Sequence, residues 1–197
     1  MKRRDEYQNF AEHPRYGKRP RITGLNPTTD DLKVFIHWHS PESCRIPGTA
    51  INADLTKQAQ ATIPVTHYFE VKRSCRECDR PFIFFAEEQK HWYEELGFGL
   101  DSDCVRCPLC RKRQQGLARK RERYEELFHL VGRNEEQNLE MADCCLTLIE
   151  NEVFHPRQTE RVRRLLNQIP EDHRSSRSYA DLLSRLREIE KKSEQAS

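Results

Sequence analysis

Two Cys-x-x-Cys motifs constrain this chain more than any other feature of its sequence. Cys75 and Cys78 form the first motif, Cys107 and Cys110 form the second, and 28 residues separate them. A two-residue spacing lets one tight turn direct both thiolates at a single point, and two such pairs supply the four-sulfur tetrahedron that Zn²⁺ prefers. We therefore expect these four cysteines to hold one structural zinc ion, as in a zinc finger. A catalytic zinc is not expected, because four thiolates leave no open position for water.

Other roles for paired cysteines fit the sequence less well. A redox Cys-x-x-Cys needs only one pair and is typical of a βαβ context, whereas here two pairs occur. A c-type haem site needs histidine directly after the motif, and Asp79 and Arg111 occupy those positions. The sequence therefore favours metal binding over redox or haem chemistry.

Cys104 complicates the choice of ligands, because Cys104 and Cys107 also form a Cys-x-x-Cys. A zinc ion takes four ligands, so one cysteine of this group is left over. Pro108 presets a turn between Cys107 and Cys110 and favours that pair. Cys104 is then a spare thiol near the metal.

Composition narrows the class of protein further. Of the 197 residues, 34% are charged, the net charge is +2, and the mean hydropathy is −0.94. This balance predicts a small ordered centre with helical extensions rather than one large apolar core. No apolar run approaches the length of a membrane-spanning helix, and the basic N-terminus is not followed by the apolar stretch of a secretory signal. We therefore expect a cytoplasmic protein whose thiols bind metal or stay free.

Hydrophobic periodicity divides the chain into four segments, and the fold class it predicts is α+β, mostly α. Residues 1–30 are basic, interrupted by proline and without periodicity, which predicts a disordered arm. Residues 31–63 form an irregular segment with one short strand over 32–39. Residues 64–115 carry strands over 65–71 and 82–85 and a short helix over 87–96, which is the β-hairpin and helix of a small zinc ribbon.

Residues 116–192 are predicted to be helical and to pack as a bundle. Their apolar stripes need partners in order to be buried. Asn134 with Gln137, and Ser178 with Asp181, have the spacing of capping boxes at helix starts. Pro156 suits the first turn of a further helix.

Residues 64–115 resemble the probable zinc-ribbon domain proteins of bacteria. The resemblance rests on both cysteine pairs, the aromatic strand 82–84, Glu88-Gln89, the segment 92–98 and Cys107-Pro108-x-Cys110-Arg111. It implies a bacterial protein with a small zinc ribbon whose Trp/Tyr helix packs on the hairpin. Cys104 is not part of the pattern. The family has no settled activity, so the resemblance implies a fold and a metal rather than a function.

His37, His39 and Cys44 are candidate ligands for a second metal site. The two histidines point the same way if they lie on a strand. Three ligands without a fourth, on a weakly ordered segment, do not favour a site, and we expect these residues to have other roles.

The charges are segregated along the chain. Residues 111–124 hold seven cations and one anion, whereas residues 125–160 hold nine anions and two cations. A basic helix that leaves a zinc site is suited to phosphate backbones. The candidate nucleic-acid-binding residues are Arg111, Lys112, Arg113, Arg119, Lys120, Arg121 and Arg123. The alternative is that the basic and acidic segments fold together and neutralise each other.

Two classes of function follow from these patterns. The first is a zinc-binding, non-enzymatic module that binds nucleic acid, either RNA, the ribosome or DNA, through the basic helix 111–123. The second is a protein–protein adaptor that uses the acidic C-terminal helices, with zinc purely structural. No catalytic triad order, Gly-rich phosphate loop or paired carboxylate motif is present, so we expect neither an enzyme nor a small-molecule substrate.

Overall fold

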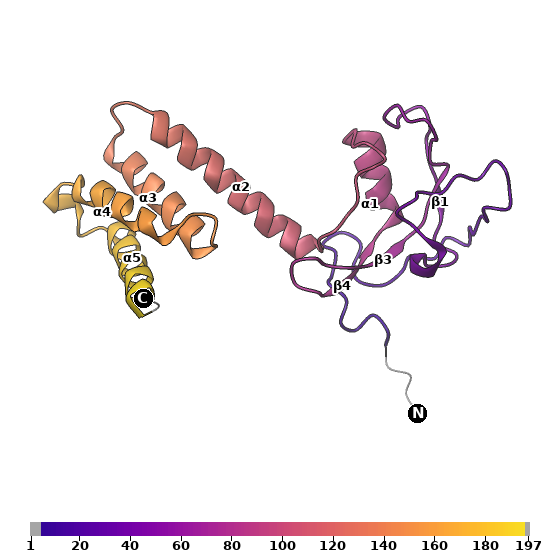
Figure 1. The fold of residues 1–197 in the computed structure, drawn as a ribbon, viewed down its shortest axis with the longest axis horizontal. Coiled ribbons are helices and arrows are strands. Elements are labelled where there is room, and N and C mark those ends of the chain that lie inside the picture. Colours follow the sequence, from indigo (N-terminus) through magenta and orange to yellow (C-terminus); the bar gives the residue numbers. More distant parts are fainter. Residues whose placement is uncertain (1–4, 196–197) are drawn as a thin grey trace. The chain divides into compact units, whose positions relative to one another are not determined.

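A computed structural model describes residues 5–195 of the chain. The chain divides into two units, Met1–Lys112 and Arg113–Ser197, which we call the N-terminal unit and the C-terminal unit. The first contains short antiparallel strands and a short helix, and the second is helical (Figure 1). The fold class is therefore α+β and mostly α, as the sequence predicts. Within the part of the chain that is described, no helix is both long and apolar enough to cross a bilayer.

The N-terminal unit contains two antiparallel hairpins. In the first, β1 (Ile51–Asn52) pairs with β2 (His67–Tyr68). In the second, β3 (Val71–Ser74) pairs with β4 (Pro81–Phe84). The sequence predicts one strand over 65–71, but the structure has two short strands there. The second hairpin positions the first cysteine pair, because Cys75 and Cys78 lie in the turn that joins its strands.

The backbone of Glu70 explains why the predicted strand is broken. Its carbonyl accepts a hydrogen bond from the Ile46 N–H at 2.9 Å, and its N–H donates to Thr49 Oγ1 at 3.1 Å. Both backbone groups are thus taken by the preceding loop rather than by a strand partner. The hairpins are separate sheets for this reason.

A helical segment follows the second hairpin and covers the cores of this unit. It begins as α1 (Ala86–Lys90) and continues as a π-helical turn over His91–Glu95. The sequence predicts a helix over 87–96 at this place. Gln89 Nε2 donates to the carbonyls of Phe69 and Phe84 at 2.6 and 3.0 Å, which fixes the helix on the strands. Gly97, with φ at +68°, follows the segment.

The prediction of a disordered arm over residues 1–30 is wrong for the part of it that the structure describes. Residues 1–4 of this arm lie outside the described residues, but from residue 5 onward the arm packs on the N-terminal unit. The Ala11 N–H donates to the Pro81 carbonyl at 2.7 Å, and Ala11 is buried. Tyr7, Phe10 and Tyr16 pack against a buried cluster of aliphatic and aromatic side chains. These anchors are single aromatic residues without periodicity, so the hydrophobic pattern of the sequence does not indicate them.

The segment 31–63 also differs in detail from its prediction. No strand forms over 32–39, where Ile36 makes one isolated bridge to His67. Phe35 is held instead by Thr66, whose N–H donates to the Phe35 carbonyl at 2.8 Å. The segment is therefore an ordered loop that is hydrogen-bonded to the first hairpin and to the residue before it.

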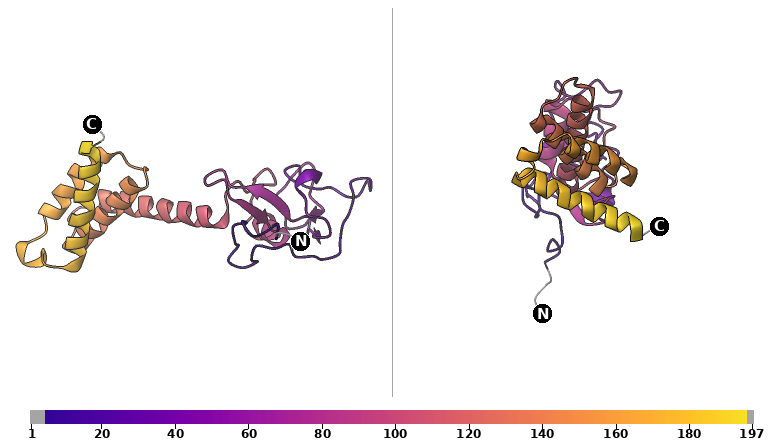
Figure 2. Two further views of the ribbon diagram at one scale, coloured as in Figure 1. Left: turned by 90° about the horizontal axis from the view of Figure 1, so that it is seen from below. Right: turned by 90° about the vertical axis from the view of Figure 1, so that its left-hand side faces the viewer.

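The C-terminal unit is a helical bundle, as the sequence predicts. Its helices are α3 (Glu135–Glu150), α4 (Thr159–Asn167) and α5 (Arg177–Gln195), which pack together, and most of α2 (Pro108–His129) (Figures 1 and 2). Their apolar stripes meet in one buried core that includes Leu127, Leu148, Leu166, Leu182 and Leu186.

Of the two capping boxes predicted in this unit, one is confirmed and the other is wrong. The Asn134 side chain accepts from the Gln137 N–H at 2.8 Å, and Gln137 Oε1 accepts from the Asn134 N–H at 3.0 Å. This is the predicted capping box of α3. At α5 the prediction of Ser178 as the cap is wrong, because Ser176 Oγ accepts from the Tyr179 N–H at 3.3 Å and the helix begins two residues earlier.

Candidate metal centre

Four cysteine sulfurs meet at one point of the structure. The Sγ atoms of Cys75, Cys78, Cys107 and Cys110 all lie within 4.8 Å of one another. The Cys78 and Cys107 sulfurs are 3.8 Å apart. A tetrahedron with Zn–S bonds of about 2.3 Å has sulfur–sulfur edges of about 3.8 Å. The Cys78–Cys107 distance equals such an edge, and no other sulfur pair of the four is more than about 1 Å longer. The four cysteines form a site for one structural zinc ion.

The first cysteine pair is presented by a tight turn between β3 and β4. The Cys75 N–H donates to the Arg80 carbonyl at 3.0 Å, and the Asp79 N–H donates to the Cys75 carbonyl at 2.9 Å. Asp79 has φ at +56°, a left-handed conformation that aspartate tolerates better than most residues. The turn therefore brings both sulfurs of the pair to the same side.

The second cysteine pair lies at the start of α2 rather than in a second free turn. Cys107 directly precedes the helix, Pro108 is its first residue, and Cys110 lies in the first turn. The Arg111 N–H donates to the Cys107 carbonyl at 3.0 Å. Proline fixes φ at the first helical position without loss of a hydrogen bond. One ligand pair thus comes from a hairpin turn and the other from a helix N-terminus.

Burial and crowding separate the acidities of these thiols. For Cys75, burial raises the pKa, but backbone N–H groups of Cys107, Glu77 and Cys78 outweigh it and lower the pKa to about 6. For Cys110, burial and the neighbouring sulfurs raise the pKa. Four thiolates at this distance repel one another unless a cation lies between them. The donor set therefore fits a divalent, thiophilic metal such as zinc.

Cys104 lies close to this site in the sequence but is not among the four clustered sulfurs. It is 1% exposed, and its Sγ donates to the Arg106 carbonyl at 3.5 Å. Burial raises the pKa of its thiol to about 12. Cys104 is thus a buried thiol that packs beside the ligands in the same core cluster.

Residues 70–119 match a family model described as a probable treble clef domain. The matched range covers a quarter of the chain and includes both cysteine pairs. The chain thus carries a treble clef zinc-finger-like domain, which is consistent with the predicted resemblance to zinc-ribbon proteins. No curated protein and no solved structure matches the chain.

Arg111, the first of the predicted phosphate-binding residues, is engaged within the N-terminal unit. Its Nη2 lies 2.7 Å from Glu88 Oε1, and its guanidinium lies 5.2 Å from the ring centroid of Trp92. His13 Nε2 is 3.3 Å from the same Glu88 oxygen. The buried carboxylate of Glu88 therefore ties α1 to the first turn of α2 and to the arm. The sequence singled out Glu88 only as part of the family resemblance, and nothing in its spacing predicted these contacts.

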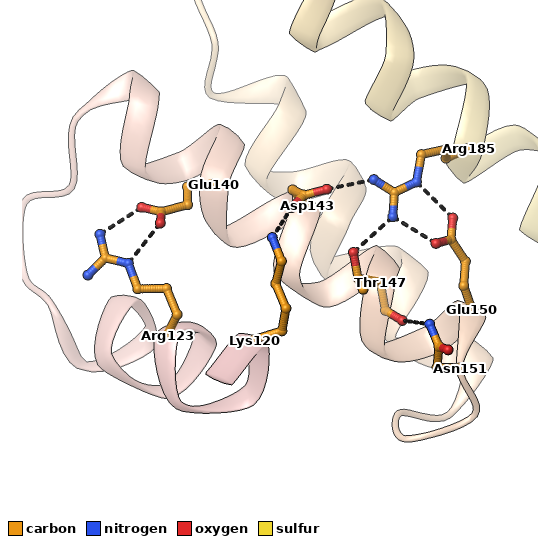
Figure 3. Close-up of polar contacts among 8 residues, drawn as sticks. All are labelled: Lys120, Arg123, Glu140, Asp143, Thr147, Glu150, Asn151 and Arg185. Carbon is orange, nitrogen blue, oxygen red and sulfur yellow. Dashed lines mark hydrogen bonds and ion pairs between the residues drawn. The ribbon is translucent and has the colours of Figure 1, made fainter. Parts of the chain in front are cut away.

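Lys120 and Arg123 are engaged within the C-terminal unit. Lys120 Nζ lies 2.5 Å from Asp143 Oδ2 (Figure 3). Arg123 forms a two-pronged pair with Glu140, with Nε–Oε1 and Nη2–Oε2 distances of 2.8 and 2.7 Å. Both acids lie on α3. The structure therefore brings the basic helix and the acidic helix together at these positions.

The remaining four basic residues have different surroundings. Arg121 pairs with Glu125 one turn further along α2, at 3.0 Å. Arg119 Nε donates to the Gln115 carbonyl of its own helix at 3.3 Å. Lys112, Arg113 and Arg119 are exposed. Their role in nucleic-acid binding stays a prediction.

The histidines at 37 and 39 do not form a second metal site with Cys44. His39 Nε2 lies 2.9 Å from the Asp101 carbonyl, and Cys44 Sγ lies beside Ser43. Over residues 5–195, the four-cysteine cluster is the one group of three or more metal-ligating side chains that comes together. The ring of His37 stacks instead on Tyr93, with centroids 5.2 Å apart.

Proposed function

We propose that this protein is a non-enzymatic adaptor, with a purely structural zinc, that binds a partner protein through its acidic C-terminal helices. The observation that carries this proposal is the neutralisation of Lys120 and Arg123 by Asp143 and Glu140. A cation held by a carboxylate has to leave that partner before it binds a phosphate, which reduces the electrostatic gain by the modest worth of a partly exposed ion pair. The basic helix thus pairs with acids of the same chain, and the surface of α3 and α5 remains available to bind another protein.

A groove between α3 and α5 supports the proposal. Its floor includes Leu139 and Leu182, and Glu136 and Asp181 lie among its acidic lining. The residues that line it are Glu136, Leu139, Glu140, Asp143, Ser178, Asp181, Leu182, Ser184 and Arg185. An apolar floor with an acidic rim is complementary to a basic amphipathic helix, which presents anchors at i, i+3, i+4 and i+7. The partner we propose is therefore a Lys- or Arg-rich amphipathic segment of another protein.

Binding of a synthetic probe tests this assignment. The probe is a fluorescent 18-residue amphipathic peptide of leucine and lysine, titrated by anisotropy with the full-length zinc-loaded protein. We expect saturable binding that the Glu136→Gln/Asp181→Asn double variant weakens about three- to tenfold, since each surface pair contributes modestly. The control is Glu160→Gln/Glu171→Gln, which changes the net charge equally outside the groove. Equal loss in both variants, or no binding by the wild type, would exclude the groove.

Nucleic-acid binding is the second candidate, supported by the exposure of Lys112 and Arg119. Neither residue has an acidic partner within the described part of the chain. Two phosphate contacts imply a log–log salt dependence with a slope of about −1.4 for single-stranded RNA. If a 20-nucleotide RNA binds with such a slope and Lys112→Gln/Arg119→Gln abolishes binding, this candidate replaces the adaptor.

A further inference from the structure

The N-terminal arm lies against the surroundings of the zinc site, although it precedes the treble clef domain matched at residues 70–119. Ala11 is buried and packs in the same core cluster as Cys75 and Cys107. Its backbone also forms a parallel bridge to Phe82 of β4. The arm is therefore in contact with the hairpin that carries the first cysteine pair.

His13 anchors the arm and has a defined tautomer. Its Nδ1 accepts hydrogen bonds from the N–H groups of Arg15 and Tyr16 at 3.1 and 3.2 Å. Because Nδ1 is an acceptor, the ring proton lies on Nε2, which is 3.3 Å from Glu88 Oε1. The ring stacks on Tyr16 and makes an edge contact with Phe85, with centroid distances of 4.7 and 5.6 Å. His13 thus presents one N–H donor to Glu88 in a fixed orientation.

The carboxylate of Glu88 connects the arm to the helix that carries the second cysteine pair. The same oxygen, Oε1, lies 2.7 Å from Arg111 Nη2, and the two side chains are 8% and 19% exposed. Glu88 Oε2 and Arg111 Nε are buried and have no hydrogen-bond partner among the described residues. Removal of one member of a buried pair leaves the other charge uncompensated, which is costly. The orientation of Arg111 therefore depends on Glu88.

Arg111 transmits this restraint to the zinc ligands. It follows Cys110 directly, and its N–H donates to the Cys107 carbonyl at 3.0 Å at the start of α2. Its guanidinium lies 5.2 Å from the ring centroid of Trp92. One helical turn therefore contains the second ligand pair and the side chain that Glu88 holds. The position of this turn decides whether the four sulfurs meet.

We infer that His13 and Glu88 are positioning residues for Cys107 and Cys110, so the zinc affinity of this protein depends on its N-terminal arm. His13 acts through Glu88, and Glu88 acts through Arg111. Loss of a residue that orients a metal ligand typically lowers metal affinity about ten- to hundredfold. His13 lies outside the matched domain, and its role does not depend on the adaptor function proposed above.

Competition with a chromogenic zinc chelator tests this role in the full-length, zinc-loaded protein. Glu88→Met removes the carboxylate and keeps the length of the side chain, so we expect zinc affinity to fall roughly ten- to hundredfold. His13→Ala should lower it about three- to tenfold, the worth of one net hydrogen bond. The control is Glu95→Gln, which removes an acid of the same helical segment whose side chain is 65% exposed. The control should bind zinc as tightly as the wild type.

A double variant tests the order in which these residues act. If His13 acts through Glu88, His13→Ala should cost less than about threefold once Glu88→Met is present, because the acceptor of its N–H is already lost. Fully additive losses would show that His13 acts independently and would overturn the proposed connection. If Glu88→Met does not fold with zinc, Glu88→Gln takes its place, since it removes the charge and keeps the shape.

Cadmium NMR distinguishes positioning from a general loss of stability. Cd²⁺ replaces zinc in the full chain, and its resonance reports the arrangement of the four sulfurs. Glu88→Gln should shift this resonance. Val65→Ala lies in a buried cluster that contains no cysteine, so it should lower stability and leave the resonance in place. An unshifted resonance in Glu88→Gln, or a zinc affinity in the Glu88 variants equal to that of the wild type, contradicts the proposal.

Discussion

The ammonium group of Lys120 lies 2.5 Å from the carboxylate of Asp143, so a cation from the basic helix is paired with an acid of the same chain. The same carboxylate lies 2.6 Å from Arg185 Nη1, and Arg185 also pairs with Glu150 (Figure 3). Burial raises the pKa of Asp143, but Lys120 and Arg185 outweigh it and hold the pKa below its usual value. Asp143 is therefore a charged junction between α2, α3 and α5.

Removal of the acidic partners should create nucleic-acid binding that the wild type lacks. The Glu140→Gln/Asp143→Asn double variant removes the α3 partners of Lys120 and Arg123 and leaves the zinc site unchanged. Arg123 then keeps only its exposed pair with Glu126 on its own helix, and Arg185 keeps Glu150. We expect this variant to bind single-stranded RNA weakly at low salt, with a log–log slope near −1.4 for two released cations. Filter binding across a salt series measures both the affinity and the slope of its salt dependence.

The matched control for that experiment is Glu160→Gln/Glu171→Gln, which makes the same change in net charge elsewhere in the C-terminal unit. It should bind no better than the wild type. Strong, salt-sensitive binding by the wild type itself would show that the cations are available as they stand, and the adaptor proposal would lose its main support.

Glu70 predicts a pH dependence of stability. Its side chain is fully buried, and both carboxylate oxygens accept from the Arg21 N–H at 3.2 and 3.1 Å. Burial, together with Glu87, raises its pKa to about 8 from the usual 4.5, against the lowering effect of Arg21. Between these two pH values the folded state binds more protons than the unfolded state. Stability should therefore fall as the pH rises from about 5 to 8.

The Glu70→Gln variant tests whether Glu70 causes this pH dependence, because glutamine has the shape of the glutamate side chain and does not titrate. Thermal unfolding of the N-terminal unit at several pH values should give a midpoint that depends less on pH than in the wild type. An identical pH profile in the two proteins would show that another group is responsible.

The C-terminal unit should unfold without loss of the metal. Leu166 is 2% exposed and belongs to the bundle core, so Leu166→Ala should lower the stability of this unit by about 2–5 kcal/mol. Circular dichroism should show that the helices of the variant unfold at a lower temperature than those of the wild type, while the zinc content stays the same. Val131→Ala, at a site that is 94% exposed, should change little. Zinc loss in Leu166→Ala would mean that the two units do not fold independently.

The sequence was sufficient for several features that depend on local spacing, although the capping box at Ser178 and the strand over 32–39 are not formed. The cysteine pairs, the helical stripes and the capping box at Asn134 each involve residues a few positions apart, and the structure contains all of them. The break at Glu70 was not predictable, because it depends on Ile46 and Thr49, more than twenty positions away.

The surroundings of the zinc site show the same limit. Cys110 was predictable from its spacing to Cys107, whereas the contact of Glu88 with Arg111 and His13 joins three separate segments. The pairing of Lys120 with Asp143 was one of two alternatives from charge segregation alone. Long-range contacts of this kind are determined by packing, and a one-dimensional pattern does not contain them.

The claim that four cysteines hold one structural zinc ion is tested most directly by native mass spectrometry of the purified full chain. We expect one zinc ion per chain in the wild type and in Cys104→Ser, and none in Cys110→Ser, whose N-terminal unit should lose its ordered NMR spectrum. A wild-type chain without metal whose N-terminal unit remains folded after chelation, or a Cys104→Ser variant that loses the ion, would contradict the account.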